Sequence, residues 1–202
     1  MKDYQLIFRD RFVNNDVLKS ISRPQYRYSC SLTALSAVIN YLFSRILGIQ
    51  TQEQIANLLG LDARCIGYNK GPGNKQLMKW FNTFTSRTSQ NAKCRIFMNK
   101  REVIDWSRNE KMIRKFKETI KSKNRILIYH LDNHFNVVCG FFESALVPFE
   151  AFAKNTKLKR WILLADHWSG SKPIYSIRWR DIRNDFLKNR EHCFIVFEKT
   201  PE

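Results

Sequence analysis

The most constraining feature of this sequence is a long apolar segment, SLTALSAVINYLFSRILG, at residues 31–48. Its apolar side chains recur every three or four residues, the spacing of one face of an α-helix: Leu32, Leu35, Ile39, Leu42 and Ile46. Further apolar residues widen this face, and Gly48 suits a helix C-terminal cap. A helix this apolar must be covered on several sides, so we expect it at the centre of the fold.

Three further helices are predicted from their caps and periodicity. Thr51 and Gln54 form a capping-box pattern before an apolar stretch, and Gly60 marks its end. After the Gly-Pro-Gly turn at 71–73, Asn74 is expected to cap a helix over residues 75–84. A basic amphipathic helix is expected at about 102–122, after a short strand with the sequence CRIFMN.

From residue 125 onward the pattern is that of β-strands. Five segments rich in Ile, Val, Phe, Tyr and Trp follow one another: RILIYHL, FNVVCGFF, RWILLAD, PIYSIRW and CFIVFEK. Helices followed by strands predict an α+β fold in which N-terminal helices pack against a C-terminal antiparallel β-sheet. We expect one domain over residues 1–202, with a helical part at about 1–122 and a sheet part at about 124–199. Residues 143–160 are expected to form an excursion or a short helix between two strands.

The chain is strongly basic. Its 202 residues include 35 Lys and Arg against 18 Asp and Glu, a net charge of +17 that is spread along the sequence. Such a charge attracts nucleic acid, anionic surfaces or acidic protein substrates. The alternative is a charge that serves only solubility. No zinc-finger spacing or other nucleic-acid-binding motif accompanies it.

The five cysteines are irregularly spaced and include no Cys-x-x-Cys pair. An odd number with this spacing disfavours both a disulfide framework and a tetrahedral zinc site. Thiols fit a reducing compartment, so we expect a cytoplasmic protein, or one exported without an N-terminal signal peptide. No uninterrupted apolar run reaches the length of a bilayer span, and no transmembrane segment is expected.

One cysteine, Cys30, immediately precedes the central helix. The unpaired N–H groups and the positive dipole end of a helix N-terminus favour a thiolate at this position. His134 lies at the entry to one predicted strand, and Asp166 lies at the exit of the next. Together these three residue types can supply a nucleophile, its general base and a carboxylate that orients the base. Each has a structural alternative, and His130, within an apolar strand, is the rival base.

The residues around this set resemble a known superfamily. RPQYRYSCSLTALSAVINYLF is similar to the catalytic-helix segment of papain-like cysteine peptidases, especially the C39-like and phytochelatin-synthase-like branches. NHFNVVCGFF resembles their histidine segment, and ILLADHWSG resembles the later strand that ends in Asp. The resemblance implies a papain-like fold with Cys30 as nucleophile, His134 as base, Asp166 as orienting carboxylate and Gln25 as oxyanion donor. The chain departs from the pattern at Ser31, where Gly is usual, and in the spacing from Gln25 to Cys30, which is one residue short.

The implied reaction is cleavage of a peptide or isopeptide-type amide through a thioester, with no metal or organic cofactor. The same residues could pass the acyl group to an amine or thiol, as the resemblance to phytochelatin synthases implies. The Gly-Pro-Gly-Asn loop at 71–74 lacks the pattern of a phosphate-binding loop. The expected partner is a peptide or protein substrate, acidic substrates included. The rival hypothesis is a non-catalytic basic module that binds nucleic acid or an anionic surface.

Overall fold

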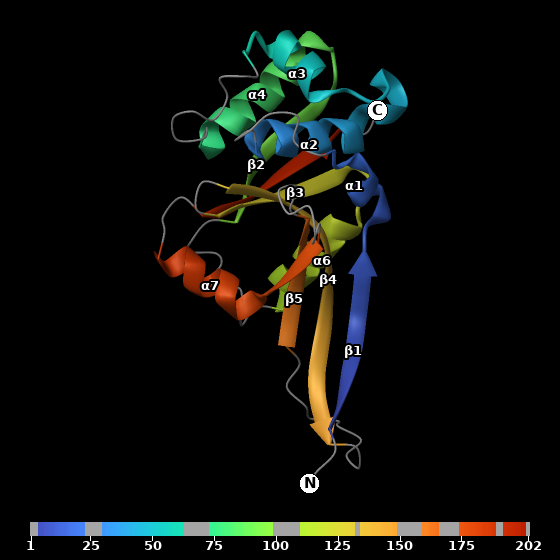
Figure 1. Ribbon diagram of the computed structural model, residues 1–202, viewed down its shortest axis with the longest axis vertical. Helices are drawn as coiled ribbons and strands as arrows, with labels where there is room; N and C mark the ends of the chain where they lie inside the picture. The colour runs from blue at the N-terminus through green and yellow to red at the C-terminus, as the bar shows by residue number, and fades with distance from the viewer. Residues whose placement is uncertain are drawn as a thin grey trace.

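A computed structural model describes residues 4–22, 30–62, 73–98, 110–131, 134–148, 159–165, 174–188 and 192–200. The fold is α+β, as predicted: helices pack against an antiparallel sheet (Figure 1). The elements in chain order are β1 (Tyr4–Val13), α1 (Asn15–Ser20), α2 (Cys30–Leu47), α3 (Gln52–Leu59), α4 (Asn74–Arg87), β2 (Ala92–Met98), α6 (Glu110–Lys121), β3 (Arg125–Leu131), β4 (His134–Pro148), β5 (Lys159–Ala165), β6 (Ile174–Arg178), α7 (Trp179–Lys188) and β7 (Cys193–Lys199).

The sheet has seven strands, and β4 is its longest. The strand order is β2-β7-β3-β4-β5-β6, and β1 pairs with β4. Along β4, residues 134–138 pair with β3 and residues 140–148 pair with β1, while β5 pairs with residues 137–144. The β4 residues that pair with β5 include some that pair with β3 and some that pair with β1, so β5 must lie along one edge of β4. The strands β3 and β1 follow one another along the other edge. Figure 1 shows β1 and β4 running together away from the helices.

Two hydrophobic clusters fix the helices to opposite faces of this sheet. The first joins α1–α4 to alternate residues of the central strands, among them Ile128, Phe135 and Val137. The second joins α6 and α7 to the intervening residues, such as Tyr129 and Val138. Side chains of a strand alternate between its two faces, so the two residue sets correspond to the two sides of the sheet. The basic helix α6 therefore packs on the face opposite to the other N-terminal helices.

The central helix α2 forms as predicted and is the core of the first cluster. It spans 18 residues of mean hydropathy 1.4, and 72% of this stretch is buried inside the protein. By length and composition alone it could cross a membrane, but here it packs against the sheet and α1, α3 and α4. The buried Asn40 fixes its C-terminal end, accepting from the Gln50 backbone N–H at 2.7 Å and donating to the Gln50 carbonyl at 3.0 Å.

Most predicted elements are confirmed, including the capping box of Thr51 and Gln54 and the left-handed cap at Gly60. The predicted strand CRIFMN is confirmed as part of β2, but the division into a helical part up to residue 122 and a separate sheet part is wrong, because β2 and the unpredicted strand β1 both belong to the sheet. Gly73 rather than Asn74 is the N-cap of α4. Residues 143–148 continue β4 instead of leaving the sheet, because β1 and β5 provide pairing partners on its two edges.

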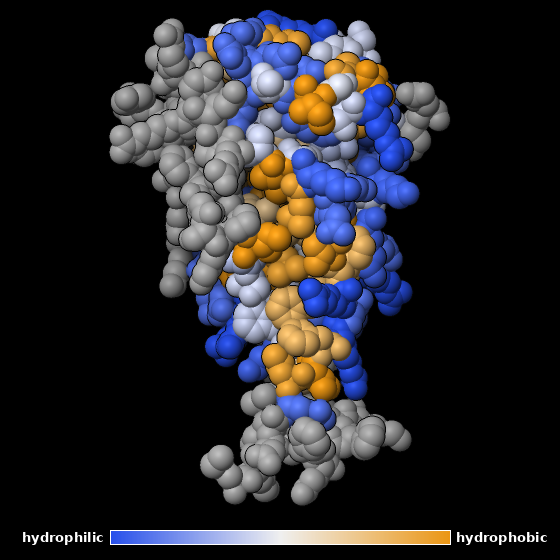
Figure 2. Space-filling model, turned by 45° about the vertical axis from the view of Figure 1, so that its right-hand side comes forward, coloured by the Kyte–Doolittle hydropathy of each residue, from blue (hydrophilic) through white to orange (hydrophobic). Residues whose placement is uncertain are grey.

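The strand β1 is an exposed edge of the sheet. Among the described strands it pairs only with β4, and Leu6 and Phe8 each expose 55% of their surface. Figure 2, in which the β1 side of the molecule is turned toward the viewer, shows apolar surface continuing down to the end where β1 begins. Natural proteins usually protect such edges with charge or with a covering element, so an exposed apolar edge indicates a contact surface.

Candidate functional site

Cys30 lies where the sequence predicted it, at the N-terminus of the central helix. It is the first residue of α2, 8% exposed, and the first turn of the helix contains no acidic side chain. It belongs to the first hydrophobic cluster, together with Phe135 and Ala165. In the sequence, Phe135 follows His134 and Ala165 precedes Asp166, so each predicted catalytic residue either belongs to this cluster or is next in sequence to a member of it.

The sheet register distinguishes the two candidate histidines. His134 is half-buried as the first residue of β4 and is paired with Leu131, which packs against the second cluster. His130 is paired with Phe135, and its ring stacks on Phe135 at 4.4 Å between centroids. By alternation, His130 occupies the sheet face that α2 covers, and the strand position of His134 belongs to the other face. The face assignment favours His130 as the base, whereas solvent accessibility favours His134, because His130 is only 2% exposed and His134 is half-buried.

Asp166 and Gln25, the predicted orienting and oxyanion residues, lie outside the described residues, as do His167 and Cys65. The strand before Asp166 is described through Ala165, which pairs with Val137. Val137 is three residues after His134 in the neighbouring strand. The predicted assignments of Asp166 and Gln25 therefore stay predictions.

The other described cysteines are unsuited to nucleophilic chemistry. Burial raises the pKa of the Cys94 thiol to about 11 and the pKa values of Cys139 and Cys193 to about 12. Cys139 and Cys193 lie within strands whose side chains pack in the first cluster, as the sequence predicted. A thiol held protonated at neutral pH is a poor nucleophile, so these three positions are structural.

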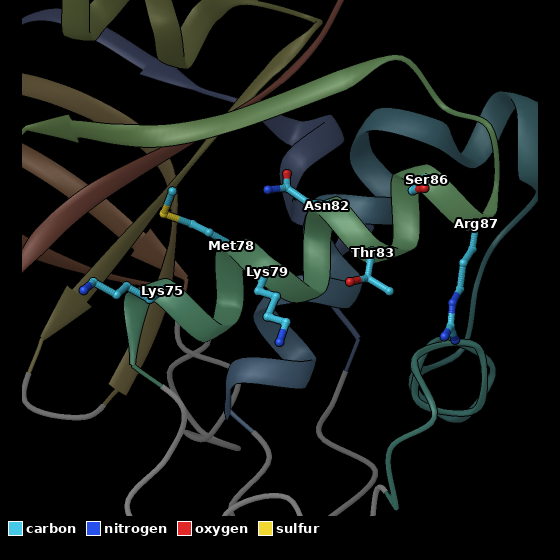
Figure 3. A pocket seen from close by; sticks show the side chains of 7 residues that line it. All are labelled: Lys75, Met78, Lys79, Asn82, Thr83, Ser86 and Arg87. Atoms are coloured by element: carbon cyan, nitrogen blue, oxygen red, sulfur yellow. The ribbon is translucent and has the colours of Figure 1, made fainter.

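A basic pocket that the sequence did not reveal lies along the exposed face of α4. Its volume is about 550 Å³, and it is lined by Lys75, Met78, Lys79, Asn82, Thr83, Ser86 and Arg87 (Figure 3). The lining residues follow helical spacing, which can be read from the sequence. The sequence does not show, however, that this face of α4 is exposed. Within the described parts of the chain, no group of three or more His, Cys, Asp and Glu could hold a metal ion.

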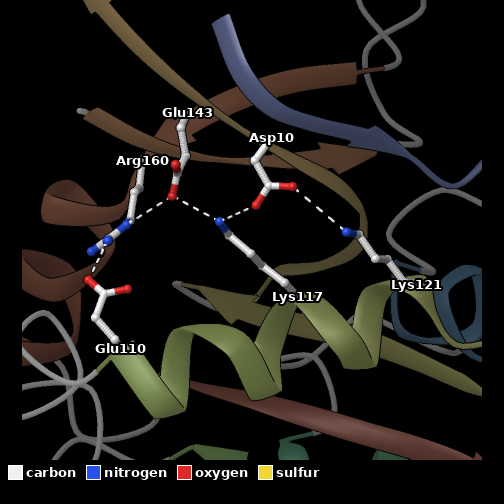
Figure 4. A network of polar contacts seen from close by, with 6 residues as sticks. All are labelled: Asp10, Glu110, Lys117, Lys121, Glu143 and Arg160. Atoms are coloured by element: carbon white, nitrogen blue, oxygen red, sulfur yellow. Dashed lines mark hydrogen bonds and ion pairs between the residues drawn. The ribbon is translucent and has the colours of Figure 1, made fainter. Parts of the chain in front are cut away.

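Part of the basic charge is neutralised inside the fold (Figure 4). The Lys117 ammonium on α6 donates to the carboxylates of Asp10 and Glu143, the latter at 2.8 Å. Arg160 on β5 donates to the same Glu143 at 3.2 Å and to Glu110. These lysine and arginine side chains fix α6 to β1, β4 and β5, and their charge is already compensated within the protein.

This network predicts a pH dependence of stability. The hydrogen bond from Lys117 lowers the pKa of Asp10 below its ordinary value of 3.8. The stabilisation is therefore present above that value and is lost as the pH falls through the folded-state pKa. Because the carboxylate is 40% exposed, we expect Asp10→Asn to cost only about 0.5 kcal/mol at pH 7. Urea unfolding should show this difference at pH 7 and none at pH 2.

The matched control is Asp16→Asn, which removes a more exposed carboxylate, 3.9 Å from Lys19. We expect it to change the free energy of unfolding by less than Asp10→Asn at pH 7 and, like Asp10→Asn, to have no effect at pH 2. Equal effects of the two substitutions would show that the network around Lys117 adds nothing beyond an ordinary surface pair.

Taken together, the fold and the charge define a class: a basic α+β protein with a cysteine at the start of its buried central helix. The family of basic immunoglobulin-like variable motif-containing proteins matches residues 8–199. The chain belongs to this family.

Relatives in the family come from distant organisms. The chain is 28% identical to the Mus musculus protein in an alignment of 179 positions that covers 82% of this chain and 35% of the relative. It is 27% identical to the Homo sapiens protein, covering 87% of this chain and 37% of the relative. For the Giardia intestinalis protein the identity is 23%, over 86% of this chain and 73% of the relative. The chain thus spans little more than a third of the length of the mouse and human relatives it matches.

Among solved structures, the chain resembles UfSP from C. elegans. The TM-score is 0.47 at 10% sequence identity, and the superposition covers 87% of this chain and 30% of that chain.

Proposed function

We propose that this chain is a papain-like cysteine peptidase or amidase that cleaves a peptide or isopeptide-type amide. The observation that carries the proposal is the position of Cys30 as the first residue of a buried 18-residue helix. This helix packs against β4, whose first residue is His134, and Ala165, which precedes Asp166 in the sequence, belongs to the same hydrophobic cluster. The sequence resemblance to the papain-like superfamily supports the same assignment.

In this proposal Cys30 is the nucleophile and His134, the more accessible histidine at the first residue of β4, is the general base; His130, on the sheet face that α2 covers, is the alternative base. The Cys30 thiolate attacks the amide carbonyl carbon, and the electron pair of the C=O π bond moves to the oxygen. The backbone N–H of Cys30 and the side chain of Gln25 would stabilise this oxyanion. As the tetrahedral intermediate collapses, the C–N bond breaks, and the leaving amine takes a proton from the His134 imidazolium.

The remaining thioester is then hydrolysed. Water gives a proton to His134 while its oxygen attacks the thioester carbon, and the C–S bond breaks to release the acid and the Cys30 thiolate. Asp166 would hold the imidazole in the tautomer that these transfers require. An amine or thiol acceptor in place of water would make the same chain an acyltransferase.

The acyl-enzyme gives a test that needs no knowledge of the natural substrate. Incubation with p-nitrophenyl acetate should place one acetyl group on Cys30, detected by intact mass and peptide mapping. Cys30→Ala should lose this adduct, and Cys94→Ala should keep it because the Cys94 thiol, with a pKa of about 11, is protonated. Acetylation spread equally over the thiols, or none in the folded protein, would rule the proposal out.

A further inference from the structure

A row of stacked side chains crosses the sheet on a part that none of the described helices covers. Phe8 on β1 contacts Phe142 on β4 edge to face, with ring centroids 5.6 Å apart. Phe142 stacks on Trp161 of β5 at 5.6 Å, with the rings 12° from parallel. The Arg178 guanidinium of β6 lies 4.9 Å from the Trp161 ring centre. We call these four residues the aromatic row.

The register explains why these residues share one face. Trp161 is paired with Phe142 on one side and with Arg178 on the other. The neighbouring positions Glu143 and Arg160 contact α6, so by alternation the aromatic row lies on the face opposite α6. On that face the first cluster includes Cys139 of β4 and extends to Leu163 of β5. On this face the sheet continues beyond the helices of the described residues, and the aromatic row lies on this continuation.

The aromatic row is both accessible and preorganised. Phe8 is 55% exposed, and Phe142, Trp161 and Arg178 are half-buried. The indole N–H of Trp161 donates to the Ser144 hydroxyl at 2.8 Å, which holds the ring in place. Figure 2 shows apolar surface that reaches the end of the molecule where β1 begins. Side chains that are already ordered lose little conformational entropy when a ligand stacks on them.

The charge around the aromatic row is positive. Lys159 is exposed and is paired with Ser144, the residue that is also paired with Phe8. The described side chains that alternation assigns to this open face include no acidic residue: Leu6, Phe8, Phe142, Ser144, Lys159, Trp161, Ser176 and Arg178. The nearest carboxylate by register, Glu143, faces α6, where Lys117 and Arg160 neutralise it.

We propose that this open sheet face binds single-stranded nucleic acid. Aromatic side chains provide stacking surfaces for bases, and Lys and Arg contact the phosphates; this combination is how sheet surfaces bind single strands without sequence preference. In this proposal a nucleic-acid base stacks on the exposed ring of Phe8. The side chains of Arg178 and Lys159 lie on the same face of the sheet and contact the phosphates of the strand. The net charge of +17 supplies the long-range attraction that brings the strand to this face. This site is separate from the proposed chemistry of Cys30.

The test is fluorescence anisotropy with a fluorescein-labelled twelve-nucleotide oligo(dT) and the intact chain. Phe8→Ala should weaken binding about five- to one-hundred-fold, because one stacked base is lost. Ile96→Ala is the matched control: Ile96 is an exposed apolar residue on β2, which lies at the far side of the sheet, and its loss should leave the affinity unchanged. Phe8 is largely exposed, so its replacement should not unfold the protein; circular dichroism of both variants checks this.

Salt dependence provides the second measurement. Lys159→Gln should reduce the slope of log Kobs against log salt by about 0.7, the value expected for one phosphate contact on a single strand. Equal affinity of Phe8→Ala and Ile96→Ala would overturn the proposal, and so would equal binding of a duplex of the same length. Binding to anionic phosphatidylserine vesicles without binding to oligo(dT) would overturn it in favour of a membrane surface.

Discussion

Gly140→Ala is expected to lower the free energy of unfolding by about 3 kcal/mol, the largest stability effect that the structure predicts for a single methyl group. A Cβ at Gly140 would overlap the backbone carbonyl oxygen of Phe12, and it would lie 3.0 Å from Leu163 Cδ1 and 3.2 Å from Val13 Cα. Two of these three neighbours are backbone atoms of β1, so relief requires the β1–β4 pairing to shift. For a chain of this size the melting temperature should fall by about 6–12 °C.

The control for this prediction is Gly73→Ala. Gly73 is the N-cap of α4, its φ is −69°, and an added Cβ would meet nothing within 4 Å. The cost should be about 0.5–1 kcal/mol, because Gly is preferred over Ala at an N-cap. If urea unfolding gave the same loss of stability for both variants, the close approach of β1 to β4 would be wrong.

The regular elements of the fold could be predicted where the sequence has one clear period. The central helix was predicted to within one residue at each end, because its apolar residues recur with the spacing of a helix. The strands RILIYHL and CFIVFEK were predicted without error, because they are short, β-branched and aromatic.

Three elements were missed, β1, α1 and α7, and the reasons for β1 and α7 can be identified. The strand β1 has three consecutive apolar residues followed by Arg-Asp-Arg, so it shows no alternation, and an irregularity interrupts its register between Arg9 and Phe12. The helix α7 was partly assigned to a strand because Trp179 continues the apolar pattern of PIYSIRW. Its buried residues Trp179, Ile182 and Phe186 do follow helical spacing, and this signal could have identified it.

The candidate site was only partly predictable. The sequence placed Cys30 at a helix start because the apolar period begins directly after it. Which face of the sheet a histidine occupies depends on strand register, and a shift of one residue moves it to the other side. The sequence analysis chose His134 as the base, with His130 as its rival, but it could not show that the strand register places the two histidines on opposite faces of the sheet.

The aromatic row shows the same limit. Phe8, Phe142, Trp161 and Arg178 come from four strands, and their contacts depend on three separate pairings. The sequence revealed the excess of aromatic and basic residues, but not that these four would share one uncovered surface.

The central claim is that Cys30 is an activated thiol. At pH 6 an ordinary cysteine of pKa near 8.5 is only about 0.3% thiolate, and a buried one is far less. A cysteine at a helix N-terminus beside a protonated histidine is largely thiolate at this pH. Its lower intrinsic nucleophilicity offsets part of this gain. Iodoacetamide should therefore modify Cys30 at least a hundredfold faster than Cys94, Cys139 or Cys193.

The identity of the base is tested in the same experiment. His134→Ala should slow the modification of Cys30 by about tenfold or more, because the thiolate loses its imidazolium partner. His130→Phe keeps an aromatic ring stacked on Phe135 and should leave the rate nearly unchanged. The reverse result would transfer the role of base to His130, the histidine on the face that α2 covers.

The measurement that tests the account most directly is the rate of iodoacetamide modification of each cysteine in the native protein at pH 6, followed by peptide mass spectrometry. The account predicts rapid modification at Cys30, its loss in His134→Ala and its persistence in His130→Phe. Slow, uniform modification of Cys30 and the buried thiols would contradict it and would make Cys30 a packing residue at the start of α2.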